Sequence, residues 1–277
     1  MSTVLKNLQK SYNKPQWWKD YDTFPLHDLK GELNCSHIVI LGAGPSLNYV
    51  EPVIEKFCAN NALFLIPDVL ARSFIKKYPT SNRIIFTLEN RRHPYLFGLA
   101  NEKIAVYYKT NILNLPKASN SIYLFHFDFD NDFNKESIES TQVVSPGTVT
   151  GAAFAWAIQT IYSEYNQKVE SIHVHTMGVD LSYPDCQMYG RLAQYPMLND
   201  YWLNRETSEW ERVLKKTTHA ILKNGYIIRT CDEFIKTKQN LETMLETVDS
   251  RLKLFDYSPL GIEHPVCAKW DPKINSE

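Results

Sequence analysis

The residues best suited to chemistry lie in the segment Gly42-Ala43-Gly44-Pro45-Ser46, which directly follows an apolar, β-branched run at 37–41. A run of this kind, followed by glycines and then a helical pattern, predicts a strand, a tight turn and a helix N-terminus. Glycines let a ligand approach the backbone closely, Pro45 suits a first helical turn, and Ser46 adds a hydroxyl beside helix N-terminal amides. We therefore expect this turn to hold a phosphate or another anion.

The turn differs from two common nucleotide-binding motifs. Leu47 stands where the dinucleotide fingerprint needs its third glycine, and no Gly-Lys-Ser/Thr follows, as a P-loop would require. A tight turn without a ligand is the alternative interpretation. We favour a binding turn because open α/β sheets place their ligands at the carboxyl ends of strands.

Three further segments of small or polar residues follow predicted strands or open a predicted helix. The carboxyl ends of parallel strands share one edge of a sheet, so all of these segments are expected to meet there. Two helix N-termini at one edge indicate an anionic ligand with more than one charged group. The segments are Glu89-Asn90, Ser145-Pro146-Gly147-Thr148 and Gly178-Val179-Asp180.

The remaining pattern alternates short apolar runs with amphipathic segments, which predicts an α/β fold with a mostly parallel, Rossmann-like sheet and helices on both faces. We place the strand at 37–41 in the interior of the sheet. The expected organisation is an N-terminal appendage (1–35), a nucleotide-binding body (36–230) and a helical C-terminal extension (231–277). Predicted strands are 37–41, 62–66, 83–88, 104–108, 121–127, 171–177 and 226–229; predicted helices are 48–60, 69–77, 152–158, 201–223 and 232–252.

Composition narrows the function classes. The chain has 277 residues and a formal net charge of −1, so it offers no global basic field for nucleic acid. No apolar run approaches the roughly 20 residues of a membrane span, and no apolar segment typical of a signal peptide follows the N-terminus. Five scattered cysteines form no Cys-x-x-Cys pair, which argues against a zinc knuckle or a disulfide framework. A cytoplasmic location is therefore expected.

An acidic segment follows the predicted strand at 121–127. His126, Asp128, Asp130 and Asp132 would share one face of an extended chain, and such a cluster could bind Mg²⁺ or another hard cation. The interpretation we favour is a strand that runs into a solvated acidic loop.

Two histidines and a basic segment complete the candidates. His173 and His175 share a strand face, but a zinc site needs further ligands, so we favour buried, hydrogen-bonded histidines and expect no metal site. Arg91-Arg92-His93 follows a predicted strand, where arginines can bind phosphate or carboxylate; a solvated loop is an equal alternative.

Three blocks of the chain resemble the signature blocks of the MptE-like superfamily: 37–47, 145–158 and 172–183. That group includes the motility-accessory-factor glycosyltransferases and archaeal 6-hydroxymethyl-dihydropterin diphosphokinases, and it is similar to bacterial sialyltransferases that use CMP-sialic acid. Its members have a Gly-x-Gly-Pro-Ser turn after the first strand, a Ser/Thr-Gly turn that opens a helix, and a Gly-x-Asp at the end of the next strand. Members differ in chemistry, so the resemblance specifies the fold more closely than the reaction.

The resemblance implies roles for the two glycine-containing turns. Residues 42–46 would hold the phosphate or ribose of a nucleotide. Ser145, Gly147 and Thr148 would form the second anion-binding turn.

It also implies roles for residues beyond these turns. Asp180 and Tyr183 would contact the ribose or the base, and Asn90 stands near the position where the family carries an acidic pair. On the residues alone, Asp180 could accept from a sugar hydroxyl, bind a metal, act as a base or simply cap its loop. His219 is the next histidine after the Gly-x-Asp block, where the sialyltransferases carry their catalytic histidine. It falls on a predicted helix, where a packing or surface role is commoner.

The expected function is a nucleotide-dependent, glycosyltransferase-like transferase that takes a CMP-activated nonulosonic sugar and passes it to a glycan or protein acceptor. Asp180 and His219 are the catalytic candidates, and this reaction requires no cofactor. A diphosphokinase that uses ATP and Mg²⁺ is the alternative, although the chain lacks the Asp-Leu-Asp-Gly and His-Ala-His-Gly-Asp-Asn motifs of those enzymes. A non-catalytic nucleotide-binding module is the third interpretation.

Overall fold

The computed structural model describes most of the chain between residues 21 and 269. Of the predicted site residues, Asn90 and Ser145 lie outside the described part, as do Glu89, 91–93 and Asp132. The described ranges are 21–88, 94–96, 98–110, 120–130, 139–144, 147–164, 172–184, 189–193, 209–223, 225–246, 252–261 and 268–269.

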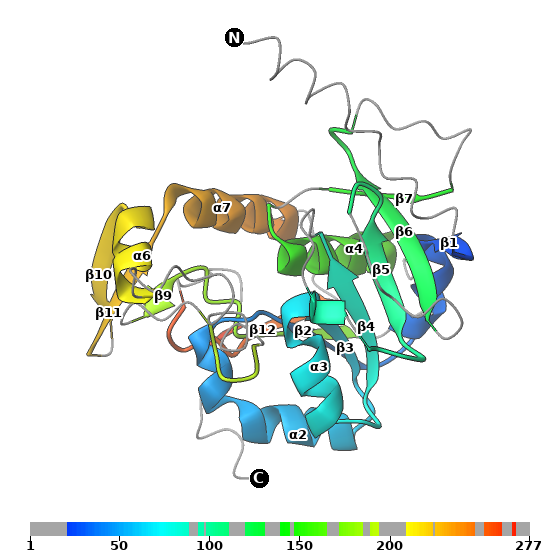
Figure 1. Ribbon diagram of the computed structural model, residues 1–277, viewed down its shortest axis with the longest axis horizontal. Coiled ribbons are helices and arrows are strands. Elements are labelled where there is room, and N and C mark those ends of the chain that lie inside the picture. Colours follow the sequence, from blue (N-terminus) through cyan, green and yellow to red (C-terminus); the bar gives the residue numbers. More distant parts are fainter. Residues whose placement is uncertain are drawn as a thin grey trace.

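The body of the molecule is a parallel sheet (Figure 1). Its strand order is β1-β6-β5-β4-β3-β2-β8-β12-β13, with β7 also paired to β6, and every pairing within it is parallel. The predicted interior position of the strand at 37–41 is confirmed, because β2 lies between β3 and β8. The strands are β1 (Thr23–Pro25), β2 (His37–Leu41), β3 (Leu63–Pro67), β4 (Asn82–Thr87), β5 (Lys103–Tyr107), β6 (Ser121–Phe127), β7 (Thr141–Val143), β8 (Ile172–Met177), β12 (Leu252–Asp256) and β13 (Ala268–Lys269).

Helices cover both faces of the sheet, as predicted (Figure 1). On one face lie α4 and α7, together with the 3₁₀ helix η2; on the other lie α2 and α3. Within the described residues, no helix has the length and apolar character that a membrane crossing requires. The helices are η2 (Leu26–Leu33), η3 (Pro45–Tyr49), α2 (Glu51–Ala59), α3 (Asp68–Lys77), η4 (Pro94–Leu96), α4 (Val149–Glu164), α6 (Glu209–Lys216) and α7 (Asp232–Glu246).

The alternation of side chains along β2 divides the core into two layers. Ile38 and Ile40 pack toward α4, whereas Val39 and Leu41 pack toward α2 and α3. All four are fully buried, which explains why this strand reads as a continuous apolar run. Small residues on α4 allow close packing on the sheet, and the ring of Trp156 lies 5.8 Å from that of Phe86.

A smaller antiparallel sheet lies beside the main one, and here the sequence-based prediction is wrong. Instead of one helix over 201–223, α6 ends at Lys216 and a hairpin follows. Its strands β10 (His219–Lys223) and β11 (Tyr226–Thr230) join β9 (Tyr183–Pro184) in the order β10-β11-β9. Gly225, with φ +82°, makes the tight turn that a helical interpretation overlooks.

Both ends of the described chain contribute strands to the main sheet. The segment before residue 36 supplies β1, and η2 buries Leu26, Leu29 and Leu33. The C-terminal region is not wholly helical, because β12 pairs with β8 after α7 has ended. The alternating run Leu252-Lys253-Leu254-Phe255 carries this strand.

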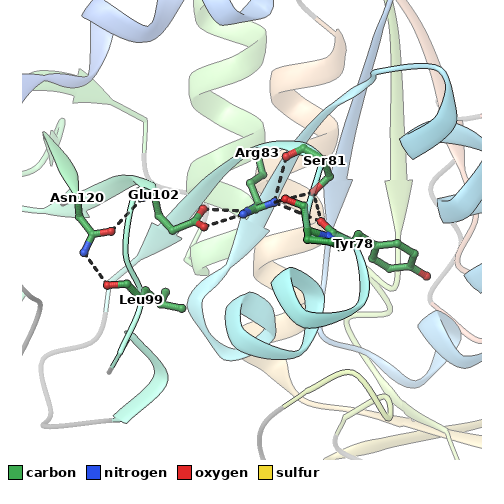
Figure 2. Close-up of polar contacts among 7 residues, drawn as sticks. Tyr78, Ser81, Arg83, Leu99, Glu102 and Asn120 are labelled. Atoms are coloured by element: carbon green, nitrogen blue, oxygen red, sulfur yellow. Dashed lines mark hydrogen bonds and ion pairs between the residues drawn. The ribbon is translucent and has the colours of Figure 1, made fainter.

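A buried ion pair ties β4 to β5 (Figure 2). Arg83 and Glu102 have side chains only 10% and 6% exposed, and they form two hydrogen bonds of 2.6 and 2.8 Å. Arg83 also donates to Ser81 and to backbone carbonyls of the preceding turn. The backbone amide of Glu102 donates to Asn120, which in turn donates to the carbonyl of Leu99. This network fixes the amino-terminal ends of two neighbouring strands.

Candidate functional site

The glycine turn after β2 is bonded to the end of β8. The amide of Gly42 donates to the carbonyl of Met177 at 2.8 Å, and the amide of Gly44 donates to the carbonyl of Gly178 at 2.9 Å. A Cβ on Gly42 would lie 2.3 Å from the Gly178 oxygen, and one on Gly44 would lie 2.3 Å from Asp180 Oδ2. Glycine is therefore required at both positions, because the two strand ends approach each other too closely for a Cβ atom.

Asp180 lies at this turn, as predicted, but it is buried. Its side chain belongs to a residue only 2% exposed, and Oδ2 accepts a hydrogen bond of 2.8 Å from the amide of Ser46. Its carboxylate thus meets the first turn of η3, where helix-terminal amides favour negative charge. The alternative considered for Asp180 is a cap on the loop that follows it, whereas the hydrogen bond observed here is to a distant segment.

Residues 257–261, which follow β12, close over the same turn. The amide of Leu260 donates to Ser46 Oγ at 3.0 Å, and the amide of Val179 donates to Ser258 Oγ at 3.1 Å. A Cβ on Gly261 would lie 2.9 Å from the Asp180 Cα. Sequence reasoning missed this segment, because no motif marks it.

The turn's remaining accessible surface is at Ala43 and Gly44, which are half-buried. Pro45 is buried within η3. The 189–193 segment lies alongside, since the amide of Gly190 donates to the carbonyl of Ala43 at 2.8 Å and the amide of exposed Arg191 donates to Asn48. The backbone of Arg191 therefore lies beside the turn, and no sequence motif marks this segment.

The second predicted turn opens α4 next to the first. Thr148 Oγ1 accepts from the amide of Gly151 at 3.0 Å, which is an N-cap, and Gly147 adopts φ +94°. Thr150 Oγ1 donates to the carbonyl of Leu41, the last residue of β2, at 3.4 Å. The N-terminus of α4 therefore lies against the end of the strand that carries the glycine turn.

Tyr183 lies in the smaller sheet. It is buried in β9, and its ring packs 5.1 Å from the ring of Phe234 on α7. The structure thus places Tyr183 in contact with a helix that covers the sheet.

His219 occupies a strand instead of the predicted helix and forms a pair with an acid. Its Nε2 lies 3.0 Å from Asp232 Oδ1, and both side chains are exposed. Hydrogen bonding, first from His219 and then from Thr218, lowers the pKa of Asp232. A carboxylate that orients an imidazole is an arrangement suited to general-base chemistry.

The smaller sheet is joined to the segment that carries Asp180. Thr230 is the cross-strand partner of His219, and its hydroxyl donates to the carbonyl of Leu181 at 2.9 Å. Leu181 directly follows Asp180 and adopts φ +47°. His219 therefore lies on the strand next to β11, and β11 is hydrogen-bonded to the residue that follows Asp180.

In the acidic segment after β6, the buried carboxylate of Asp130 has a structural role. Asp130 is buried and accepts from Tyr107 Oη, Lys109 Nζ and the Phe127 amide at 2.7–2.9 Å. Burial and then this carboxylate raise the pKa of Tyr107. Asp128 and Phe129 are exposed, so these two residues of the described segment fit the solvated loop that we favour from the sequence.

His173 and His175 share a face with a third histidine, His37. His37 Nδ1 lies 3.1 Å from His175 Nε2, which is a hydrogen bond of the kind expected for buried histidines. Sequence reasoning missed His37, because the contact depends on the register between β2 and β8.

Comparison with known proteins supports the fold. No family model matches the chain, and no curated protein matches it. Among solved structures, it is similar to the MAf glycosyltransferase from Magnetospirillum magneticum AMB-1, with a TM-score of 0.53 at 13% identity. The match covers 90% of this chain and 34% of that one, so this chain spans about a third of that protein's length. At this identity the likeness shows a shared α/β fold.

Proposed function

We propose that this chain is a nucleotide-dependent, glycosyltransferase-like transferase that uses a CMP-activated nonulosonic sugar. The observation that carries the proposal is the meeting of three segments at one edge of the sheet: the glycine turn, the 178–180 segment and the N-terminus of α4. The fold shared with a glycosyltransferase supports the same class.

Topology favours this edge as the ligand site. Strands β2 to β6 follow one another to one side of β2, whereas β8 and β12 lie on its other side. The direction of strand addition therefore reverses between β2 and β8. In open α/β sheets, ligands bind outside the carboxyl ends of the strands at such a reversal.

The proposed reaction needs groups that stabilise the departing phosphate and a base that takes the proton of the acceptor hydroxyl. The acceptor hydroxyl forms a bond to the anomeric carbon of the sugar, the bond from that carbon to the CMP phosphate oxygen breaks, and CMP leaves with the electron pair. Amides at the N-terminus of α4 and the cation of Arg191 would stabilise the departing phosphate. CMP is a good leaving group, so the proposed bond cleavage needs no metal.

The acceptor proton needs a base, and we assign this role to His219. Asp232 orients its imidazole at 3.0 Å, and both groups are exposed to an incoming acceptor. Asp180 then has a positioning role, because its buried carboxylate holds the Ser46 amide and so the shape of the turn.

The test is CMP release from a CMP-nonulosonate by the purified full chain, with and without EDTA. We expect release in both conditions, and His219→Gln should lower the rate about 10²- to 10⁴-fold, which is the usual contribution of a general base. His27→Gln is the matched control, since His27 is an exposed histidine paired with Asp28 in η2. Thermal unfolding in the same buffers separates loss of activity from loss of fold.

Three other outcomes would overturn the proposal. Activity only with ATP, Mg²⁺ and a hydroxymethyl-dihydropterin would establish a diphosphokinase instead. CMP binding without turnover would indicate a binding module. Equal rates for His219→Gln and the wild-type chain would remove His219 from the mechanism.

A further inference from the structure

We propose that His37, His173 and His175 form a binding site for one divalent transition-metal ion, with Zn²⁺ as the favoured ion. This site goes beyond the proposed transferase function and is separate from the nucleotide edge. About 16 Å of strand lies between His37 and Gly42, at the usual rise per residue. A metal bound here would join β2 to β8 at their amino-terminal ends.

Strand register brings the three imidazoles to one face of the sheet. His37 is the direct partner of His173 across the β2–β8 pair, and Val39 is the partner of His175. Side chains alternate along a strand, so all three histidines point to the face covered by α2. The ring contacts agree, because Phe57 of α2 lies 5.6 Å from the His37 ring and 4.4 Å from the His175 ring.

The ring nitrogens lie close to the spacing of a tetrahedral metal site. One ligand nitrogen from each histidine lies within 4.8 Å of the other two, in the one such group among the described residues. Zn–N bonds of about 2.0–2.1 Å place two nitrogens of a tetrahedron about 3.3 Å apart. His37 Nδ1 and His175 Nε2, at 3.1 Å, already meet that spacing. Binding would require the proton shared by these two nitrogens to leave and the half-buried His173 ring to approach them.

Two nitrogens of this group are buried without a hydrogen-bond partner among the described residues: His173 Nε2 and His175 Nδ1. Of these, His173 Nε2 is free to serve as a ligand beside the His37 Nδ1–His175 Nε2 pair. Buried polar atoms almost always have a partner, so an orphaned imidazole nitrogen beside two others indicates a missing ligand. In the proposed site, His173 Nε2, His37 Nδ1 and His175 Nε2 are the metal ligands, and a water molecule takes the fourth position.

Burial lowers the pKa of all three imidazole rings. Burial, followed by the neighbouring histidines, lowers the pKa of His175 to about 3. Burial also lowers the pKa of His37, and burial, His37 and Lys253 lower that of His173. Burial thus disfavours the charged form of each ring.

The surroundings of the cluster are apolar on the inner side. His175 is 4% exposed and stacks on Phe255 at 5.1 Å, with Tyr257 at 5.7 Å. His37 and His173 are half-buried, which gives an ion a route from solvent. Imidazole ligands on an apolar wall match Zn²⁺ better than Mg²⁺ or Ca²⁺, which prefer oxygen ligands.

The experiment uses the metal-stripped full chain, kept reduced, and titrates it with ZnCl₂ by calorimetry. We expect one Zn²⁺ per chain. His173→Gln should weaken binding about 10- to 100-fold or more, because loss of a ligand costs at least as much as loss of a group that merely orients one. His27→Gln, an exposed histidine elsewhere, should bind like the wild-type chain.

A second measurement identifies the ligand type. Co²⁺ in the same site should give the visible absorption of a tetrahedral ion without the near-ultraviolet charge transfer of thiolate ligands. Cys35→Ser should leave binding unchanged, although Cys35 Sγ lies 3.3 Å from the His37 carbonyl. His37→Gln repeats the test if His173→Gln fails to fold. Absence of stoichiometric binding, equal affinity in the histidine variants or a thiolate band would each overturn the proposal.

Discussion

The carboxylate of Asp180 accepts a hydrogen bond of 2.8 Å from the amide of Ser46, although 134 positions of sequence separate the two residues. This bond joins the end of β8 to the start of η3. Ser46 is fully buried, and its hydroxyl accepts from the amide of Leu260. Three distant segments thus meet at Ser46, and the shape of the candidate nucleotide site depends on them.

Asp180→Ala should lower the free energy of unfolding by about 1.5–3 kcal/mol, because the Ser46 amide loses a charged acceptor in a buried position. Asp180→Asn keeps an acceptor oxygen and should cost less. Urea unfolding measures both. Asp128→Ala, at an exposed aspartate, is the control and should stay within about 0.5 kcal/mol of the wild-type chain. Equal losses for the alanine and asparagine variants would contradict the assigned hydrogen bond.

Gly42→Ala should be destabilising by about 1–3 kcal/mol or more, since its Cβ would lie 2.3 Å from the Gly178 carbonyl oxygen. That atom belongs to the backbone and cannot move cheaply. Gly31→Ala is the matched control, because no atom lies within 4 Å of the added Cβ. Thermal unfolding of the two variants should differ clearly; similar midpoints would mean that the strand ends separate easily.

Glu102→Gln should cost about 3–5 kcal/mol, because it leaves the buried Arg83 charge without its partner. Replacing both residues by apolar ones, as in Arg83→Met/Glu102→Leu, should recover part of this loss. Glu32→Gln breaks the more exposed pair with Lys103 and should cost less than about 1 kcal/mol. Denaturant unfolding of the four proteins provides the comparison, and a double variant worse than Glu102→Gln would contradict the argument.

Stability should fall as pH falls below about 6.5, the pKa of histidine in an unfolded chain. His175 has its pKa lowered to about 3 in the folded chain, so the unfolded chain binds more protons between these two values. The slope for this residue approaches about 1.4 kcal/mol per pH unit in that window, and its contribution is complete above it.

Urea midpoints of the metal-free chain measured from about pH 7.5 to pH 4.5 would show this slope. His175→Phe keeps an aromatic ring against Phe255 and removes the titrating group, so its midpoint should depend less on pH. An unchanged slope in this variant would assign the effect to other residues.

Local patterns predicted the elements that are built from continuous apolar runs. The strands over 37–41 and 121–127 have the predicted bounds, because each run is buried and ends in a turn. The helix expected over 69–77 begins one residue earlier, at Asp68. The hairpin of β10 and β11 was missed because exposed Leu222 and Ile227 give no clean alternation of apolar and polar residues.

Long-range contacts could not be predicted in this way. The bond between Leu260 and Ser46 spans 214 positions, and no motif at either end indicates it. His37 joins His173 and His175 only once the register of β2 and β8 is known. The sequence predicted that the glycine turn and the Gly-x-Asp segment are neighbours. It did not show that the Asp180 carboxylate accepts a hydrogen bond from the Ser46 amide.

The place of β2 in the sheet has a consequence for how the protein is made. One neighbour, β3, follows β2 after only η3 and α2, whereas the other, β8, begins at Ile172. At 5–20 residues per second, β8 begins about 7–26 s after β2 is complete, and one side of β2 stays unpaired for that time. An unpaired strand side can pair with other chains. Residues 257–261 complete the turn later still, so the candidate site takes its full shape only after residue 261 has been added.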